Sequence, residues 1–578
     1  MNVDSAVSVS ARTVRRDRKS WIAVVVLALG WSVWKAGVDP TEAVNARGWS
    51  QFAAFFRAMF RPDLSADMLK LAGRESATTI GYALTGTALA LGIGSVGGLL
   101  LTERLWSPIH GPMKRGRAGW AITRVMFAVP RSLHEVVFGI ILVAILGLDP
   151  LVAVLAIGIP FGAVTSKVFA ELIDDVPIGP ELSLRAAGAG RFTALLTATV
   201  PQALSDLVSY AFYRLECSLR SAAVLGIIGA GGLGFQLALS FQSLRYEQMW
   251  TFLWALVILS GCADGWSSVV RRRRNRSSHV SGQQLQSSTL SDGTTLTNDR
   301  RTVPTFGVQS KPERDWVVVA SASACVVGVP LAIWRLGLDI STLWAPRARA
   351  LASQLASDAW PPEAGAGGLR QLVADSLDTV ALAVLSIAIA LVVSTPLSFL
   401  AHRTSASVRK RNYGRSLGAW GGSGLVRLVL LISRSVPPPV WAFVVVFVLF
   451  PGLWPGAVAL GIYNAGILGR LQAEVIENSD HRPAKILSAT GATRPGAFVV
   501  ATMPVLGSRF AALGLYRWEV AVRETVIVGV VGAAGLGRRL DEQTSSFDYD
   551  AMLATVVALA AVTVVVDLTS ASIRRSFR

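Results

Sequence analysis

The chain has 578 residues, of which 52% are hydrophobic and 16% are charged, and its mean hydropathy is +0.49. This composition excludes an ordinary soluble multidomain protein and favours a polytopic membrane protein. The formal net charge of +18 alone would suggest nucleic-acid binding. The basic residues cluster between apolar runs, however, which is the positive-inside pattern of membrane proteins. We therefore expect a multi-pass chain whose termini and central linker are cytoplasmic.

Apolar runs long enough to cross a bilayer as helices predict two sets of six spans. The first set covers residues 20–38, 77–101, 120–148, 151–173, 204–228 and 249–270. The second set covers residues 316–334, 380–400, 425–450, 453–476, 505–531 and 551–573. The segment 271–314 is rich in Ser, Thr, Gln and Arg and is expected to be a flexible cytoplasmic linker. The predicted domains are therefore 1–270 and 315–578.

The two sets of spans are copies of each other. Arg131 recurs as Arg434, a shift of 303 positions (434 minus 131), whereas nearer the N-terminus Trp34 recurs as Trp334 at a shift of 300. Other pairs at a shift of 303 are Ser132 and Ser435, Gly188 and Gly491, Pro201 and Pro504, Tyr213 and Tyr516, Glu216 and Glu519, and Arg220 and Arg523. Because six is even, the halves have the same orientation and should be parallel repeats about an axis along the membrane normal.

Between the first two spans, residues 39–75 carry Phe52, Phe55, Phe56, Met59 and Phe60 at helical spacing. This spacing predicts an amphipathic helix at the outer surface. Two roles remain open for it, packing at the interface or docking of a partner.

The fifth span of the first half ends in a G-x-G-x-x-G pattern formed by Gly229, Gly231 and Gly234. A dinucleotide site would need a soluble strand–turn–helix unit around it, and the repeat has Ala534 in place of Gly231. We instead expect glycines that allow close helix packing and unwound backbone at a pore or gate. The expected gate or packing glycines are Gly229, Gly232, Gly234, Gly532, Gly535 and Gly537.

Ionisable side chains within spans are costly and usually face the bundle interior or a cavity. Glu216 and Arg220 are four residues apart and should pair on one helix face, and Glu519 and Arg523 should repeat this pair. The predicted translocation path comprises Arg131, Ser132, Arg434, Ser435, Glu216, Arg220, Glu519, Arg523, Tyr213 and Tyr516. Purely structural interhelical pairing by the charged members remains an equal alternative.

Enzyme signatures are absent from the sequence. No Walker A segment occurs, so ATP hydrolysis must come from a partner, and the five histidines lack metal-ligand spacing. His134 beside Glu135 could relay a proton, but a local hydrogen-bonding role is favoured because the second copy has proline there. We expect no catalytic residue, metal or cofactor in this chain.

Three pairs of motifs carry a family resemblance. They are RSLHE (131–135) and RSVPPP (434–439), YRLECSLRSAAVLGIIGAGGLG (213–234) and YRWEVAVRETVIVGVVGAAGLG (516–537), and AAGAGRFTALLTATVPQ (186–202) and ATGATRPGAFVVATMP (489–504). With these motifs the chain resembles the permease of bacterial phosphonate ABC importers, which have the type I importer fold. The resemblance implies an all-α polytopic membrane protein, here a tandem parallel repeat of two six-helix type I transmembrane domains in the bacterial cytoplasmic membrane.

The resemblance also implies partners. Two ATP-binding subunits, which would carry ATP and Mg, would dock on cytoplasmic coupling loops, and an extracytoplasmic solute-binding protein would deliver a phosphonate-, phosphite- or phosphate-like anion. One copy of the fused chain would form the whole permease and work by alternating access. The implied coupling residues are Ala186, Ala187, Gly188, Pro201, Ala489, Gly491 and Pro504.

The sequence departs from the family pattern at one coupling position. The acid usually found six residues before the loop glycine is replaced by Leu182 and Lys485, although Glu181 is adjacent in the first half. Either unequal ATPase contacts in the two halves or a contact that relies on shape rather than charge would follow. The alternatives in function are an importer permease for another small solute and an ion-coupled secondary transporter with parallel repeats.

Overall fold

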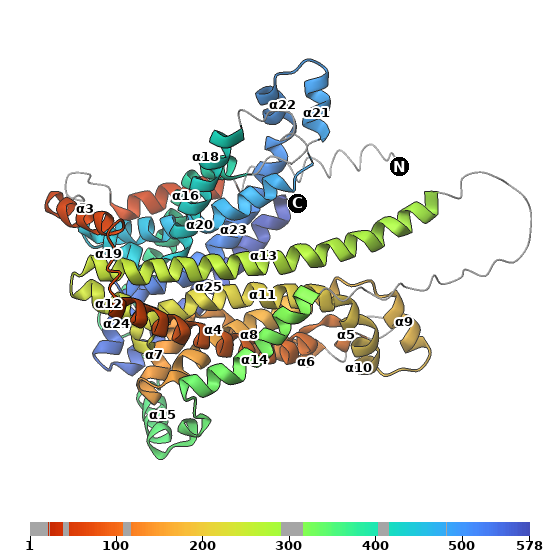
Figure 1. Cartoon of the computed structure of the whole chain (residues 1–578). Coiled ribbons are helices and arrows are strands. Elements are labelled where there is room, and N and C mark those ends of the chain that lie inside the picture. The colour runs from red at the N-terminus through yellow and green to blue at the C-terminus, as the bar shows by residue number, and fades with distance from the viewer. Residues whose placement is uncertain are drawn as a thin grey trace, which may run out of the picture.

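The computed structural model describes residues 21, 23–37, 45–107, 117–290, 316–402, 416–480 and 482–577. These residues are predominantly helical, and no β-strand occurs among them (Figure 1). The main helices of the first half are α4 (Ala66–Leu101), α6 (Arg117–Ser132), α7 (Glu135–Leu146), α8 (Pro150–Asp174), α11 (Val200–Leu225), α12 (Gly232–Gln242) and α13 (Tyr246–Leu290). Those of the second half are α14 (Trp316–Leu336), α16 (Gly368–Ala401), α18 (Ser416–Ser435), α19 (Pro438–Val448), α20 (Leu453–Glu477), α23 (Met503–Gly529), α24 (Leu536–Ser545) and α25 (Tyr549–Phe577).

Several of these helices could cross a membrane by length and composition. Within the described part of the chain, six single helices qualify and three bent helix pairs could each add a span. The remaining expected spans correspond to the shorter apolar helix Ala23–Ala36 and to α20 and α23, which are the repeat copies of α8 and α11. The all-α, tandem-repeat prediction is confirmed.

The third span of each half is bent, although we expected it to be continuous. The chain turns by 84° between α6 and α7 and by 97° between α18 and α19. His134 and Pro437, which precede α7 and α19, both have extended backbone, with ψ of 151° and 146°. Three consecutive prolines enforce the break in the second half, because proline disfavours the helical conformation of the residue before it. In the first half the His134 side chain caps α7.

The glycines at the end of the fifth span break the helix, as expected. In the first half, Gly229, Gly231 and Gly232 have φ values of +107°, +91° and +75°, and the helix bends by 55° before α12. In the second half, Gly532 and Gly535 have φ values of +92° and +101°. Such values favour glycine because a Cβ would clash with the backbone.

The break brings the backbone against the second helix of the same half. The hydroxyl of Thr79 accepts a hydrogen bond from the amide of Leu233 at 3.0 Å, and Thr379 accepts one from Leu536 at 2.9 Å. A Cβ on Gly232 or Gly535 would lie 2.7 Å from the same threonine oxygen. The close-packing role of these glycines is therefore present in both copies.

Within each half, the closest helix contacts join α4 to α8 and α16 to α20. Small and large side chains alternate across the first contact: Gly158 faces Leu89, and Gly162 faces Ile93. Since lipid and core are equally apolar, close packing of small residues is a main source of helix association in membranes.

The two halves interlock. Helix α14 packs on α4 of the first half, and Lys35 in the helix Ala23–Ala36 forms an ion pair of 3.1 Å with Asp378 of α16. Each half thus lends its first helix to the other. Helix α3 (Trp49–Ala58) adds a further link, because the neighbouring Asn45 amide donates to the Val448 carbonyl at 2.7 Å.

The expected outer amphipathic helix corresponds to α3, which has a packing role. Phe55 is buried, and its carbonyl accepts a hydrogen bond of 2.7 Å from the indole of Trp250 in α13. The docking alternative remains untested for its exposed residues.

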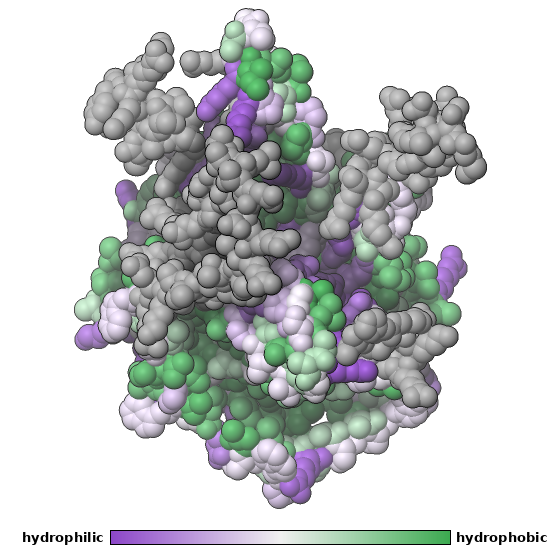
Figure 2. Space-filling view, turned by 90° about the vertical axis from the view of Figure 1, so that its right-hand side faces the viewer, coloured by the Kyte–Doolittle hydropathy of each residue, from purple (hydrophilic) through white to green (hydrophobic). Residues whose placement is uncertain are grey.

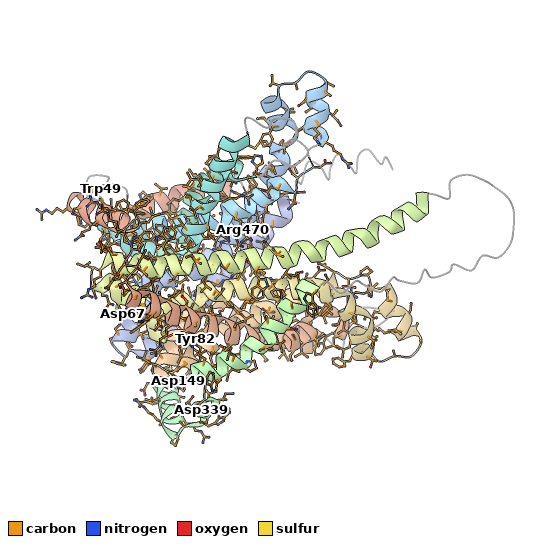
Figure 3. The ribbon with its side chains drawn as sticks, viewed as in Figure 1. Trp49, Asp67, Tyr82, Asp149, Asp339 and Arg470 are labelled. Carbon is orange, nitrogen blue, oxygen red and sulfur yellow. The ribbon has the colours of Figure 1, made fainter. Side chains whose placement is uncertain are left out.

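The bundle has two distinct ends (Figure 1). One end carries the short helix pairs α9 (Gly179–Ala186) with α10 (Arg191–Ala194) and α21 (Arg482–Ala489) with α22 (Arg494–Ala501). We call it the α9/α21 end. Trp49, Asp149 and Asp339 lie at the opposite end, and Arg470 lies between the two ends (Figure 3). Helix α13 continues to Leu290, past residue 271, where we expected the linker to start. No proline occurs between residues 271 and 290 to end the helix. Residues 291–314 lie outside the described ranges.

We predict that Gly234→Ala destabilises the protein, since a Cβ there would lie 1.9 Å from the carbonyl oxygen of Ala223. Overpacking of this kind costs about 1–3 kcal/mol. Gly92→Ala in α4 is the matched control, because its Cβ would meet nothing within 4 Å. Thermal unfolding in detergent should show a lowered midpoint for Gly234→Ala only; equal midpoints for the two variants would contradict the packing role.

Candidate functional site

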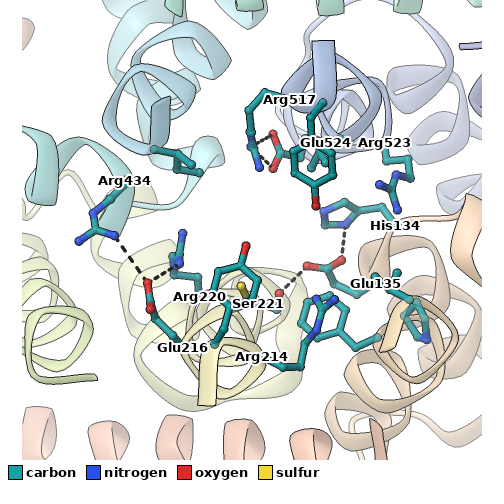
Figure 4. Close-up of a pocket in the computed structure, with 18 of the residues that line it drawn as sticks. His134, Glu135, Arg214, Glu216, Arg220, Ser221, Arg434, Arg517, Arg523 and Glu524 are labelled. Carbon is teal, nitrogen blue, oxygen red and sulfur yellow. Dashed lines mark hydrogen bonds and ion pairs between the residues drawn. The ribbon is translucent and has the colours of Figure 1, made fainter. Parts of the chain in front are cut away.

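A cavity of about 520 Å³ lies between the two halves. Its walls come from α7, α8 and α11 of the first half and from α20 and α23 of the second, with Arg434 and Pro438 at the α18–α19 bend (Figure 4). Figure 2, which looks onto the α9/α21 end, shows hydrophilic residues in the hollow of this face and apolar residues on its flanks. We call the cavity of about 520 Å³ between the two halves the central cavity.

The central cavity is lined by cationic and anionic groups from both halves. Its arginines are Arg214, Arg220, Arg434, Arg470, Arg517 and Arg523. Its carboxylates are Glu135, Asp206, Glu216, Glu474 and Glu524. Tyr213 and Tyr516, predicted from the sequence, line it as well. Fixed guanidinium groups that are partly removed from bulk water attract anions more strongly than they would in water.

Glu216 connects the two halves. Its Oε1 pairs with Arg220 at 3.0 Å, as the i, i+4 spacing predicted, and also with Arg470 at 3.2 Å and Arg434 at 3.6 Å. Asp264 of α13 joins the same cluster, 2.5 Å from Arg434 and also paired with Arg470. Three arginines thus share two carboxylates across the interface.

The repeat copy of this arrangement differs from the prediction. Glu519 does not pair with Arg523; it forms an ion pair with Arg574 of α25. Arg523 instead donates to the backbone carbonyl of Arg131 at 3.0 Å. Glu519 is also not among the residues that line the central cavity. The i, i+4 spacing permits the predicted pair, but a closer tertiary partner is available to each side chain.

Three other predicted path residues do not line the central cavity either. Arg131 borders a separate, smaller cavity with Lys167, and it is 3.9 Å from Asp567 of the second half. Ser132 is buried and donates to the Val129 carbonyl at 2.7 Å, and Ser435 is buried behind the bend. Only Arg434 of the predicted Arg–Ser pairs reaches the central cavity, because the halves pack unequally around the bend.

Sequence reasoning missed a second buried cluster. Arg517 donates through Nη2 to both oxygens of Glu524, at 2.8 and 3.0 Å, and through Nε to Asn464 at 2.7 Å. These residues, like Arg470 and Arg214, lie inside predicted spans, where an ionisable or amide side chain is itself a signal of the bundle interior.

His134 and Glu135 have the favoured local role. The His134 Nδ1 accepts a hydrogen bond from the Val136 amide at 3.3 Å and lies 3.2 Å from Glu135. The other Glu135 oxygen accepts a 2.6 Å hydrogen bond from Ser221. His134, Glu135 and Ser221 all line the central cavity (Figure 4).

The predicted coupling loops form paired short helices with glycine between them. Gly188 follows α9 with φ +94°, and Gly491 follows α21 with φ +97°. Pro201 lies in the first turn of α11, and Pro504 lies in the first turn of α23. Ala186 and Ala489 are the last residues of α9 and α21, and Ala187 caps α9. The residues predicted to bound the loops therefore lie where helices end or begin in the structure.

Glu181 is not available at the surface of its loop. It is 1% exposed, and it accepts hydrogen bonds from Arg104 at 3.2 Å, Arg185 at 3.3 Å and Thr199 at 2.9 Å. The second loop has Ala484 and Ser488 at the positions of Glu181 and Arg185, so it cannot form this cluster. The two loops are held in different ways.

We predict that Arg434→Gln destabilises the protein far more than Arg131→Gln. Arg434 is buried and pairs with Asp264 and Glu216, so its loss removes one of the three cations that neutralise these two carboxylates. Breaking a buried ion pair costs up to about 3–5 kcal/mol. Arg131 is the matched control, since it is more exposed and lies 3.9 Å from its partner. Thermal unfolding in detergent measures the midpoint of each variant. Similar decreases in the two midpoints would show that the ion cluster between the halves adds no particular stability.

Comparison with known proteins gives two matches to one family. Residues 94–275 and 414–578 each match the binding-protein-dependent transport system inner membrane component family. The chain is 28% identical over 549 residues to the phosphate-import permease protein of Mycolicibacterium smegmatis, covering 94% of this chain and 92% of that protein. It is 31% identical to the phosphite transport system permease protein of Stutzerimonas stutzeri, covering 44% of this chain and 88% of that protein.

A solved chain of the methionine ABC transporter MetNI, in an inward-facing conformation, is 21% identical with a TM-score of 0.32 and covers 36% of this chain and 99% of its own. The family matches together cover more than half of the present chain, and each falls in one of the two repeats. The predicted permease resemblance is confirmed. The chain belongs to the family of binding-protein-dependent transport system inner membrane components: it is a tandem, multi-pass inner-membrane permease, a transport component and not an enzyme.

Proposed function

We propose that this chain is the complete permease of an ATP-driven importer for small phosphorus oxyanions, the class that includes phosphate, phosphite and phosphonates. The observation that carries the proposal is the central cavity, in which six arginines from both halves surround a space between the repeats. The relatives' names point to the same class of solute.

The charge arrangement fits passage of an anion. Arginine has a permanent charge and a planar fork of donors that matches tetrahedral oxyanions. The cavity carboxylates, Glu216 and Glu524 above all, neutralise part of this charge. Transport requires release as well as binding, so a partly neutralised cavity serves it better than a fully cationic one.

Partners follow from the proposed function. The halves 1–270 and 315–578 would be the two permease domains, and each would seat one ATP-binding subunit on its paired short helices, α9–α10 or α21–α22. The α9/α21 end would then be cytoplasmic, together with both termini. A solute-binding protein would dock at the opposite end, and ATP and Mg would belong to the ATP-binding subunits.

Alternating access would use the breaks in the helices. The third spans bend by 84° and 97° beside the central cavity, and the fifth spans break at glycines with positive φ. Bends of this kind let one half-helix move relative to the other at low cost. Gly229, Gly232, Gly234, Gly532, Gly535 and Gly537 would act at the gate as well as in packing.

We predict that vesicles containing this chain, its ATP-binding partner and its solute-binding protein take up phosphate, phosphite or a phosphonate only when ATP is supplied. Binding protein loaded with the transported solute should stimulate ATP hydrolysis, and vesicles without the chain are the control. Uptake driven by an ion gradient without any ATP-binding subunit would replace the proposal with secondary transport.

We predict that Gly188→Val and Gly491→Val weaken assembly with the ATP-binding subunit. Their positive φ values disfavour a side chain by about 1–2 kcal/mol, although a Cβ at either position would meet nothing within 4 Å. The change should therefore reshape the loop and leave the bundle folded. Co-purification measures the effect, and Gly507→Val in α23, also with nothing within 4 Å, is the control. If both variants still co-purify normally with the ATP-binding subunit, these loops do not form the contact with it.

A further inference from the structure

One deeply buried arginine of the central cavity has no carboxylate partner among the described residues. Arg214 of α11 is 7% exposed, and it makes no ion pair with a carboxylate in the described ranges. Its Nη2 donates to the Tyr210 hydroxyl at 2.5 Å, and its guanidinium lies 4.5 Å from the ring centre of Phe161. Its Nε is buried without a hydrogen-bond partner. A buried cation with an unused donor is unfavourable unless something else satisfies it.

The repeat copy shows what Arg214 lacks. Arg517, 303 positions later, is held by Glu524 and Asn464. The first half has Ser221 in place of Glu524 and Phe161 in place of Asn464. Ser221 is itself engaged, since it donates to Glu135 at 2.6 Å. The carboxylate and the amide that neutralise and orient Arg517 therefore have no counterpart around Arg214.

The remaining arginines of the central cavity are less available. Arg220, Arg434 and Arg470 share Glu216. Arg523 has no carboxylate partner among the described residues, but its Nη1 is committed to the backbone carbonyl of Arg131 at 3.0 Å. Arg434 and Arg523 also have a buried Nε without a hydrogen-bond partner, but Arg434 has carboxylate partners and Arg523 is less deeply buried. Arg214 alone among the cavity arginines combines deep burial and an open Nε with the lack of a carboxylate partner in the described ranges.

We propose that Arg214 is a substrate-binding residue, which holds the tetrahedral oxyanion of a phosphate or phosphonate inside the membrane. The site is asymmetric and belongs to the first half. In the second half the equivalent arginine, Arg517, is already neutralised by Glu524. Tyr210 and Phe161 are positioning residues that fix the guanidinium plane through a hydrogen bond and a cation–π contact. The Nε–H, which has no hydrogen-bond partner in the protein, is then the donor left for an oxyanion oxygen. This inference rests on the proposed function.

The test uses the whole transporter in vesicles, with inorganic phosphate and methylphosphonate as the probes. Arg214→Gln should lower uptake at least about tenfold, since a hydrogen-bonded charge contact is lost. Arg214→Lys should recover part of it by restoring the charge without the fork. Ser221→Glu copies the second half and should lower uptake similarly while Arg214 is kept. Arg124→Gln, an arginine stacked on Trp120 outside the central cavity, is the matched control.

A direct measurement separates binding from folding. Equilibrium binding of inorganic phosphate to the full chain in nanodiscs should weaken in Arg214→Gln and Ser221→Glu and stay unchanged in Arg124→Gln. The site is overturned if Arg214→Gln and Ser221→Glu both transport and bind phosphate as strongly as the wild type. That outcome would leave the proposed function intact. If Arg214→Gln does not assemble into the transporter, the test rests on Ser221→Glu. Normal phosphate uptake by the Ser221→Glu transporter would then overturn the site.

Should the wild-type transporter take up neither probe, nor phosphite, while its ATP-binding subunits remain active, the proposed function itself fails and the site fails with it. The two failures are therefore distinguishable.

Discussion

Ionised groups inside a membrane-spanning bundle must find partners, and this constraint organises the centre of the molecule. Removing a guanidinium or a carboxylate from water costs several kcal/mol, which only close pairing and hydrogen bonding offset. Glu216 and Asp264 of the first half meet Arg434 and Arg470 of the second. The middle of the interface between the repeats is consequently polar, and Glu216, Arg434 and Arg470 of this ion cluster line the central cavity.

The packing around this centre is reciprocal. Each half lends its first helix to the other half, and helix α3 of the first half joins the backbone near α19 of the second. Such exchange makes the halves a single unit in spite of their separate origins in the chain. The third and fifth spans of both halves are the places where the transmembrane helices break.

Duplication has freed the two copies to differ. In a symmetric dimer any substitution appears twice, whereas in a fused chain it appears once. Glu181 anchors the first coupling loop and has alanine as its counterpart. Glu524 neutralises Arg517, while Arg214 keeps its charge available. Both differences lie at positions that would be identical in a symmetric dimer, so the two halves of this chain are chemically unequal there.

The sequence by itself determined the class of the protein, because apolar run length, basic loops and a constant repeat shift depend only on residue order. It also determined the broken fifth spans, since glycine conformation is local, whereas the i, i+4 spacing only permits an ion pair, which forms at Glu216–Arg220 and not at Glu519–Arg523. Only the tertiary structure decided the partner of Glu519, the pairing of Glu216 with Arg434 and Arg470, and the position of Arg131 outside the central cavity. These depend on which helices pack together, within one half or across the repeat interface. Contacts between residues far apart in the chain carry no local signal in the sequence, and the ion pairs that join the two halves are such contacts.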